Sequence, residues 1–291
     1  MDSPHSDSDV KYLVFDIESI PDPTLVSLVR TSGQKSPSDA LREYQEEIMS
    51  KKGTDFVPYN FHVPVSLALA KVAGDYSLKE LTVLKIENGG PQKICERFWE
   101  GWRYYNRPQL VTFNGRSFDV PLMELIAFRY GVSIPDWFDD QKPSYQQCRN
   151  RYASYHLDLY DFLCNYGASV LVGGLNVAAK ILRKSGKIGT KGDMVQELIE
   201  TGRLDDVHDY CRCDVLDTYF VFLRICVLRG KISLERENEL IEQTRQFLEE
   251  NSDDIPVYRE YLKAWKGVVD YSEANDEISR LISLSTHTYL Q

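Results

Sequence analysis

The sequence has no excess of basic residues. Its 291 residues include 34 Lys and Arg against 44 Asp and Glu, which gives a formal net charge of -10 and a pI near 5.1. Proteins that hold duplex DNA through its phosphates usually carry a basic excess instead. Taken alone, the composition favours an enzyme for small molecules, and any contact with nucleic acid must be local, metal-assisted or helped by a partner.

Long hydrophobic runs and a dense set of cysteines are absent as well. No apolar run approaches the roughly 18 residues that a membrane helix needs. Residues 1–9 are polar and acidic, which predicts a disordered leader rather than a signal peptide. The six cysteines are scattered, which is typical of reduced thiols in a core. We therefore expect a cytoplasmic protein that has no membrane contact and no disulfide framework.

What is present indicates a folded α/β protein. Hydrophobic residues make up 43% of the chain and predict a sizeable core. Strand-like runs alternate with helix-like periods, which predicts a mixed β-sheet flanked by helices. The expected strands cover residues 11–17, 63–72, 81–86, 110–113 and the start of 156–163. The expected helices cover residues 36–52, 93–105, 120–130, 176–184, 194–201 and 206–228.

A domain boundary is predicted near Gly230, where the last long helix ends. The main domain then spans residues 10–230, and residues 231–291 form a helical C-terminal extension with charged faces and few core positions. This extension is expected to pack on the domain or to recruit a protein partner. A chain that ends at about residue 231 is expected to keep a folded core.

Two carboxylates, Asp16 and Glu18, stand at the end of the strand over residues 11–17. Because side chains two apart on a strand point to the same face, both lie on one side of the sheet. Neighbouring negative charges repel each other, and a divalent cation removes the conflict. The alternative is a strand that simply ends in solvated acids.

A third carboxylate lies in the segment NGRSFDVP, residues 114–121, between a strand and a helix. Asp119 opens the helix, where an acidic residue also complements the free N–H groups and the helix dipole. A capping role is therefore the alternative to a functional one. Asn114 ends the strand and either hydrogen-bonds a ligand or shapes the turn.

The helix over residues 206–228 places Asp214 on its apolar stripe, with Tyr210 one turn earlier on nearly the same face. The stripe comprises Val207, Cys211, Asp214, Thr218, Phe222 and Ile225. A carboxylate in the interior needs a partner, which is either a metal ion or a Lys or Arg side chain. The four carboxylates form a set of hard oxygen ligands, which predicts two Mg²⁺ or Mn²⁺ ions rather than Zn²⁺.

Three segments resemble the exonuclease motifs of the DEDD, or DnaQ-like, 3′-5′ exonuclease superfamily: FDIE (15–18), NGRSFDVP (114–121) and YCRCD (210–214). A Tyr four residues before the last Asp marks the tyrosine subtype of that superfamily. The second motif is similar to that of the exonuclease domain of family B DNA polymerases, and Asp158 and Asp161 also fit the pattern. The resemblance covers roughly residues 10–228 and points to a stand-alone exonuclease related to that domain.

This resemblance implies a ribonuclease-H-like fold and a metal-dependent exonuclease that hydrolyses single-stranded DNA from its 3′ end, with a role in DNA repair. It implies that Tyr210 positions the attacking water and that four residues ligate the two metal ions: Asp16, Glu18, Asp119 and Asp214. Two alternatives stay open. One is an RNA exonuclease, because that choice lies in contacts to the 2′-OH. The other is a catalytically silent nucleic-acid-binding module of the same fold.

Further substrate contacts are predicted from a basic, glycine-rich segment, residues 180–192. Lys184 and Lys187 are candidates for holding phosphates there, and a solvated helix face and loop is the alternative. Phe118 is expected to stack against the terminal base, with core packing as its alternative. His156 either contacts substrate or has a structural role.

Overall fold

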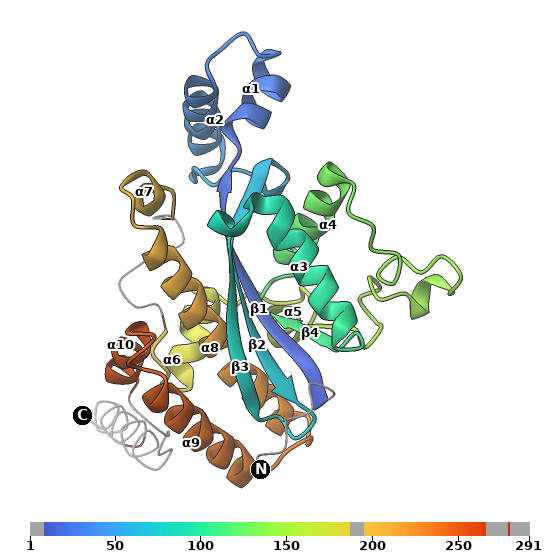
Figure 1. The fold of residues 1–291 in the computed structure, drawn as a ribbon, viewed down its shortest axis with the longest axis vertical. Coiled ribbons are helices and arrows are strands. Elements are labelled where there is room, and N and C mark those ends of the chain that lie inside the picture. The colour runs from blue at the N-terminus through green and yellow to red at the C-terminus, as the bar shows by residue number, and fades with distance from the viewer. Residues whose placement is uncertain (1–8, 187–194, 266–278, 280–291) are drawn as a thin grey trace, which may run out of the picture.

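The computed structural model describes residues 9–186, 195–265 and 279. Within these residues, five strands form one mixed sheet in the order β3-β2-β1-β4-β5 (Figure 1). The strands are β1 Val10–Pro21, β2 His62–Ala73, β3 Leu78–Lys85, β4 Gln109–Thr112 and β5 His156–Asp158. β1, β2 and β3 pair antiparallel, whereas β4 runs parallel to β1 and β5 runs parallel to β4. The predicted mixed sheet is confirmed.

Helices cover both faces of this sheet. The longer ones are α2 Pro37–Lys52, α3 Gly90–Tyr104, α4 Asp119–Tyr130, α8 Leu204–Leu228 and α9 Leu234–Glu250. The shorter ones are α1 Pro23–Thr31, α5 Leu159–Leu163, α6 Gly174–Ile181, α7 Val195–Glu200 and α10 Val257–Ala264, with 3₁₀ turns η2 Tyr59–Phe61, η3 Ile86–Asn88 and η4 Ser144–Gln146. Among the helices described, none is both long and apolar enough to cross a membrane.

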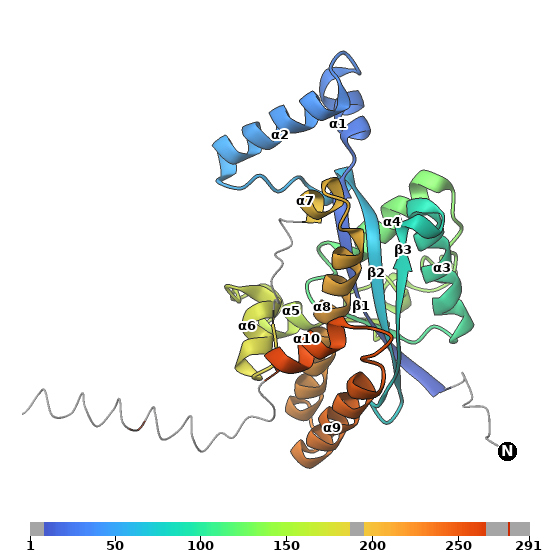
Figure 2. The same cartoon turned by 60° about the vertical axis from the view of Figure 1, so that its left-hand side comes forward.

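The two faces of β1 explain its uninterrupted apolar run. Val14 packs into the core beneath α8, while Leu13 and Phe15 pack into the core beneath α3 and α4. Figure 2 shows α8 with α6, α9 and α10 on one side of the sheet and α3 with α4 on the other. A strand that is buried on both faces needs apolar residues at successive positions, because neighbouring side chains point in opposite directions.

A helical hairpin of α1 and α2 is inserted between β1 and β2 and projects from one end of the sheet (Figure 1). α2 begins as predicted, because the Ser36 hydroxyl accepts a hydrogen bond from the Asp39 N–H at 3.2 Å. α1 was not predicted, although the Asp22 carboxylate caps it and also pairs with Arg129 of α4 at 2.7 Å. The hairpin has a small core of its own, formed by Val26, Ala40, Leu41, Ile48, Val57 and Phe61.

Residues 231–265 of the C-terminal segment pack into the main core, which is one of the two roles expected for this segment. The expectation that it has few core positions is wrong, because six of its apolar side chains are buried in the core around α8: Leu240, Ile241, Leu248, Tyr258, Tyr261 and Trp265. Buried Glu237 of α9 accepts hydrogen bonds from the Arg224 guanidinium of α8 at 2.7 and 2.9 Å. The Tyr261 hydroxyl of α10 donates to Asp217 of α8 at 2.6 Å.

The domain boundary predicted near Gly230 can be tested by truncating the chain there. A chain ending at residue 230 exposes the apolar flank of α8, and each large buried side chain is worth about 2–5 kcal/mol. Because that total rivals the roughly 5–15 kcal/mol of an ordinary domain, we expect this chain to be insoluble or to lack a cooperative thermal transition. A chain ending at residue 265 keeps these contacts and is the control. Equal melting temperatures for the two chains would show that the domain ends at Gly230.

Candidate active site

Three of the predicted carboxylates meet where α8 crosses β1. Asp16 and Glu18 lie on β1 and Asp214 on α8, and one carboxylate oxygen from each lies within 4.8 Å of the others. Glu18 and Asp214 are buried and Asp16 is half-buried. The Cys211 thiol, one turn before Asp214, donates to the Asp16 carbonyl at 3.4 Å. This contact fixes α8 against β1 at the height that brings the three carboxylates together.

Asp119, the first residue of α4, lines the same cleft and is buried. Burial raises the pKa of its carboxyl to about 7, and the nearby charge of Asp158 acts in the same direction. Backbone N–H groups of Asp119 itself and of Ile17 lower that pKa by hydrogen bonding. Since Ile17 stands between Asp16 and Glu18, Asp119 faces the same stretch of β1 as the other carboxylates.

The turn that leads into Asp119 is organised by Asp158, at the end of β5. The Asp158 carboxylate accepts hydrogen bonds from the N–H groups of Asn114 and Arg116, both at 2.9 Å. Asn114 adopts a φ of 67°, and a Cβ on Gly115 would lie 2.5 Å from the Thr112 side chain. Steric constraints therefore explain both residues of the Asn-Gly pair. Asn114 tolerates the left-handed conformation, and Gly115 fits the tight packing against Thr112.

Tyr210 lies one turn before Asp214, as the helical spacing predicted, and its side chain is buried. Burial raises the pKa of its hydroxyl well above the usual value, and the charges of Asp214, Glu18 and Asp16 raise it further. A hydrogen bond to the Asp214 carboxylate acts in the same direction. Without metal ions the phenol is therefore protonated at neutral pH and serves as a hydrogen-bond donor.

These groups line a cleft of about 720 Å³ at the base of the α1–α2 hairpin. Its lining includes Asp16, Glu18, Asp119, Asp214, Tyr210, Asn114, Ser117, Phe118, Thr54, Asp55, Phe56, His62 and Gln196. Such a volume suits a small organic group such as one nucleotide. One wall of the cleft carries acidic groups, so negatively charged ligands require a cation there.

An aromatic group forms another part of the lining. The Phe118 ring lies 5.8 Å from the Phe56 ring and 5.6 Å from the His62 ring, centroid to centroid. Phe118 also packs against the core beneath α3 and α4, which was the alternative considered for it, while stacking against a terminal base stays a prediction. Burial lowers the pKa of His62 to about 4, so this ring is neutral at pH 7. The sequence contained no signal for Phe56 or His62, because the chain between α2 and the start of β2 brings them to the cleft.

The predicted basic segment does not reach the cleft where the structure describes it. Lys184 is buried, and its ammonium lies 4.5 Å from the Phe220 ring and 4.2 Å from the Trp265 ring. Burial lowers its pKa to about 7. Lys184 is therefore a core residue of the α8–α10 interface rather than a phosphate contact in this structure, and Lys187 lies outside the described residues. His156 is also buried, with its Nε2 2.8 Å from the Thr112 hydroxyl.

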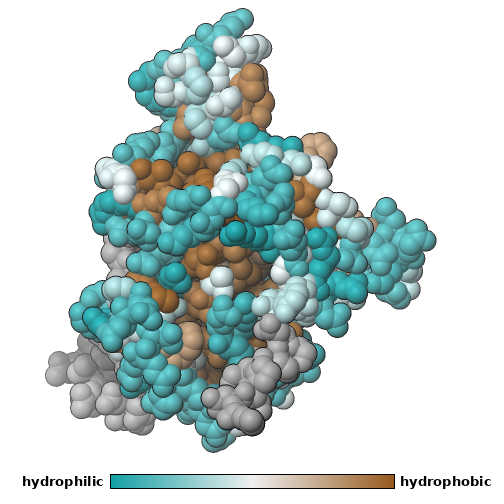
Figure 3. Space-filling view, in the orientation of Figure 1, coloured by the Kyte–Doolittle hydropathy of each residue, from teal (hydrophilic) through white to brown (hydrophobic). Residues whose placement is uncertain are grey.

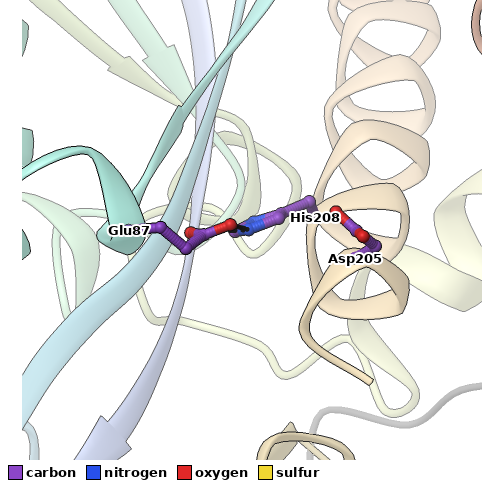
Figure 4. A group of neighbouring side chains, drawn as sticks. All are labelled: Glu87, Asp205 and His208. Carbon is purple, nitrogen blue, oxygen red and sulfur yellow. Dashed lines mark hydrogen bonds and ion pairs between the residues drawn. The ribbon is translucent and has the colours of Figure 1, made fainter. Parts of the chain in front are cut away.

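A second group of possible metal ligands lies beside α8 (Figure 4). The buried His208 ring points toward Glu87 of η3, with its Nε2 3.1 Å from both carboxylate oxygens, and its Nδ1 is 2.9 Å from the Ser66 hydroxyl. Asp205 is exposed and pairs with Lys85 at 3.2 Å. The Lys85 ammonium is thus the cation that already pairs with Asp205, and this exposed ion pair contributes little to stability. The buried His208 contacts are the ones that fasten α8 to Ser66 of β2 and Glu87 of η3.

A family model described as a predicted 3′-5′ exonuclease related to the exonuclease domain of PolB matches residues 54–265. The chain therefore belongs to this exonuclease family, and the ribonuclease-H-like α/β fold expected from the sequence is confirmed. A search of curated proteins finds no match. The matched segment includes α9 and α10, together with Asp119, Tyr210 and Asp214, but begins after Asp16 and Glu18. The placement of those two residues in the site therefore rests on geometry.

The raised pKa of Asp119 predicts how stability depends on pH in the absence of metal. The folded state favours the protonated form of Asp119. The contribution of this group to the stability of the fold is therefore complete below about pH 3.8 and is lost as pH rises through about 7. Asp119→Asn stays neutral. In EDTA at pH 8 we expect it to be more stable than the parent by on the order of 4 kcal/mol, and the difference should shrink toward pH 4.

Denaturant titrations at both pH values measure this difference. Asp205→Asn, which changes an exposed carboxylate of α8, is the matched control and should unfold like the parent at either pH. If Asp119→Asn and the parent have the same stability at pH 8, the Asp119 charge is not penalised by burial.

Proposed function

We propose that this protein is a metal-dependent exonuclease that removes nucleotides from the 3′ end of single-stranded DNA by a two-metal mechanism. The observation that carries the proposal is the convergence of Asp16, Glu18 and Asp214 within 4.8 Å, with Asp119 on the same cleft. Membership of a predicted exonuclease family supports the same reaction class. The presence of four acidic side chains and a phenol in one cleft favours a catalytic site over a catalytically silent binding module, because grouped carboxylates repel a nucleic acid that binds without metal ions.

The donor chemistry of the cleft fits divalent metal ions. Carboxylates this close repel one another, and a hard cation such as Mg²⁺ or Mn²⁺ removes the repulsion. The ligands would be Asp16, Glu18, Asp119 and Asp214, and a cation beside Asp119 would lower its raised pKa. When bound, two such ions stabilise the attacking and leaving oxygens of a phosphoryl displacement.

Tyr210 would place the attacking water. Its hydroxyl adjoins the carboxylates, and a phenol O–H can donate a hydrogen bond to the oxygen of a water molecule or hydroxide. Orientation of the nucleophile in this way selects one line of attack on phosphorus. This role would place the protein in the tyrosine subtype of the DEDD superfamily.

The substrate end would be held by Asn114 and Phe118. Asn114 is exposed in the cleft, and Phe118 offers a ring against which a terminal base can stack. Stacking on Phe118 requires an unpaired 3′ base, which favours a single strand over a duplex. RNA is the second candidate substrate, because none of these contacts depends on the sugar. The free, buried cysteines support action in the reducing cytoplasm.

The proposal is tested with oligonucleotides of DNA and RNA that carry a 5′ label. With Mn²⁺ or Mg²⁺ we expect a ladder that shortens from the 3′ end and releases mononucleotides, and EDTA should stop the reaction. Asp16→Asn should lower the rate by at least about 10²–10³-fold, since it removes a ligand of the ions that would stabilise the developing charge. Asp205→Asn is the matched control and should keep the parent rate. Cleavage by Asp16→Asn at the parent rate would rule out the proposed metal site.

Tyr210→Phe separates catalysis from packing, because it removes only the hydroxyl. If Tyr210 positions the water, kcat should fall by about 10²–10⁴-fold while KM stays nearly constant. If its hydroxyl is only structural, the variant should lose about 1 kcal/mol of stability and keep its kcat. Measurement of kcat and Tm on one preparation distinguishes the two, and full activity with a lowered Tm would exclude Tyr210 from catalysis.

A further inference from the structure

A cluster of one arginine and two exposed tyrosines lies on the surface of the segment around β5 and α5. The Arg151 guanidinium carbon lies 5.8 Å from the centre of the Tyr152 ring and 5.8 Å from that of the Tyr166 ring. The tyrosines are 83% and 60% exposed, so most of each ring surface is open to solvent. Bases of a single strand stack on such aromatic faces and on arginine planes.

Two arginines lie close together in this cluster. Arg151 and Arg116 both pair with the same carboxylate, that of Asp161, at 3.3 and 3.1 Å. The Asp158 carboxylate also lies beside Arg116 and accepts a hydrogen bond from its backbone N–H at 2.9 Å. The two guanidinium groups still place cationic side chains on a chain that carries -10 as a whole, and such local groups are what an acidic protein needs in order to hold a phosphate.

The cluster is also continuous with the cleft. Arg116 belongs to the turn after β4, and its neighbours Asn114 and Ser117 line the cleft. Between α4 and β5 the chain projects from the body of the molecule in Figure 1, and this projection has a hydrophilic surface in Figure 3. Arg116 therefore links the two regions, because its turn contributes to the cleft and its guanidinium pairs with Asp161 in the cluster.

The backbone at Tyr166 is strained. Its φ is 56°, a left-handed conformation that is unusual for a bulky residue, and its N–H is held by the Asp161 carbonyl at 2.7 Å. Such strain persists only where surrounding contacts impose it, and it occurs preferentially at binding sites. Asp161 thus holds Arg116 and Arg151 through its side chain and Tyr166 through its backbone.

We propose that Arg116, Arg151, Tyr152 and Tyr166 form a binding surface for the part of a single-stranded nucleic acid that lies upstream of its 3′ end. This inference rests on the proposed function for the direction of the strand. The arginines contact phosphates and the tyrosine rings stack on bases. The surface adds affinity for long strands and leaves the handling of the terminal nucleotide to the cleft.

The test measures binding in EDTA, where no cleavage interferes, by anisotropy of 5′-labelled dT12, U12 and dT3. For Tyr152→Ala/Tyr166→Ala we expect the Kd for dT12 to rise about 10-fold or more, since each stacked base contributes substantially, with little change for dT3. Tyr152→Phe/Tyr166→Phe keeps the rings and should bind dT12 like the parent. Arg151→Ala should reduce the slope of log Kd against log salt by about 0.7.

Two controls use exposed residues elsewhere, Tyr104→Ala at the end of α3 and Arg42→Ala on α2, and both should leave Kd and its salt slope unchanged. The proposal is overturned if the double alanine variant binds dT12 like the parent, if it loses dT3 equally, or if the parent binds neither DNA nor RNA. Comparison of dT12 with U12 shows which strand the surface accepts. Tyrosine-dependent binding by a parent that hydrolyses nothing would support the surface and refute the proposed nuclease activity.

Discussion

The packing of α8 against β1 is the interaction on which the rest of the site depends. β1 supplies Asp16 and Glu18, and α8 supplies Tyr210 and Asp214, so neither element holds a site alone. The buried Cys211, hydrogen-bonded to the Asp16 carbonyl at 3.4 Å, joins the two elements at the level of the carboxylates. A shift of α8 by one residue would turn Asp214 away from β1, because successive residues differ by about 100° around the helix.

The same helix explains why α9 and α10 are part of the protein core. α8 has buried side chains around most of its circumference, so the sheet covers only one of its sides. α9 and α10 cover another side. Arg224 of α8 pairs with the buried Glu237 of α9, and Tyr261 of α10 donates a hydrogen bond to Asp217 of α8. Asp217 stands one turn after Asp214, and its buried carboxyl has a pKa raised to about 7 by desolvation. The helix that positions the site is thus held rigid from both sides.

Stability and chemistry are opposed in the cleft. Carboxylates that converge in a buried place weaken the metal-free fold, and the raised pKa of Asp119 is one expression of this cost. Nucleic acid is polyanionic, and the chain carries a net charge of -10. Attraction must therefore be local, which is the physical link between the metal ions proposed for the cleft and the arginine–tyrosine surface proposed beside it.

Much of the architecture follows from local patterns in the sequence. The apolar run of β1, the Ser36-Pro37 start of α2 and the stripe of α8 each specify an element, because period and capping act within a few residues. The spacing of Tyr210 and Asp214 also determined that they share a face of α8. Three other features were decided by contacts between distant segments: the entry of Phe56 and His62 into the cleft, the burial of Lys184 beneath Trp265, and the place of α9 and α10 in the core. Charge and polarity along the chain suggested that Lys184 and α9 are exposed to solvent. Burial, however, depends on which surfaces the fold brings together, and only the tertiary structure contains that information.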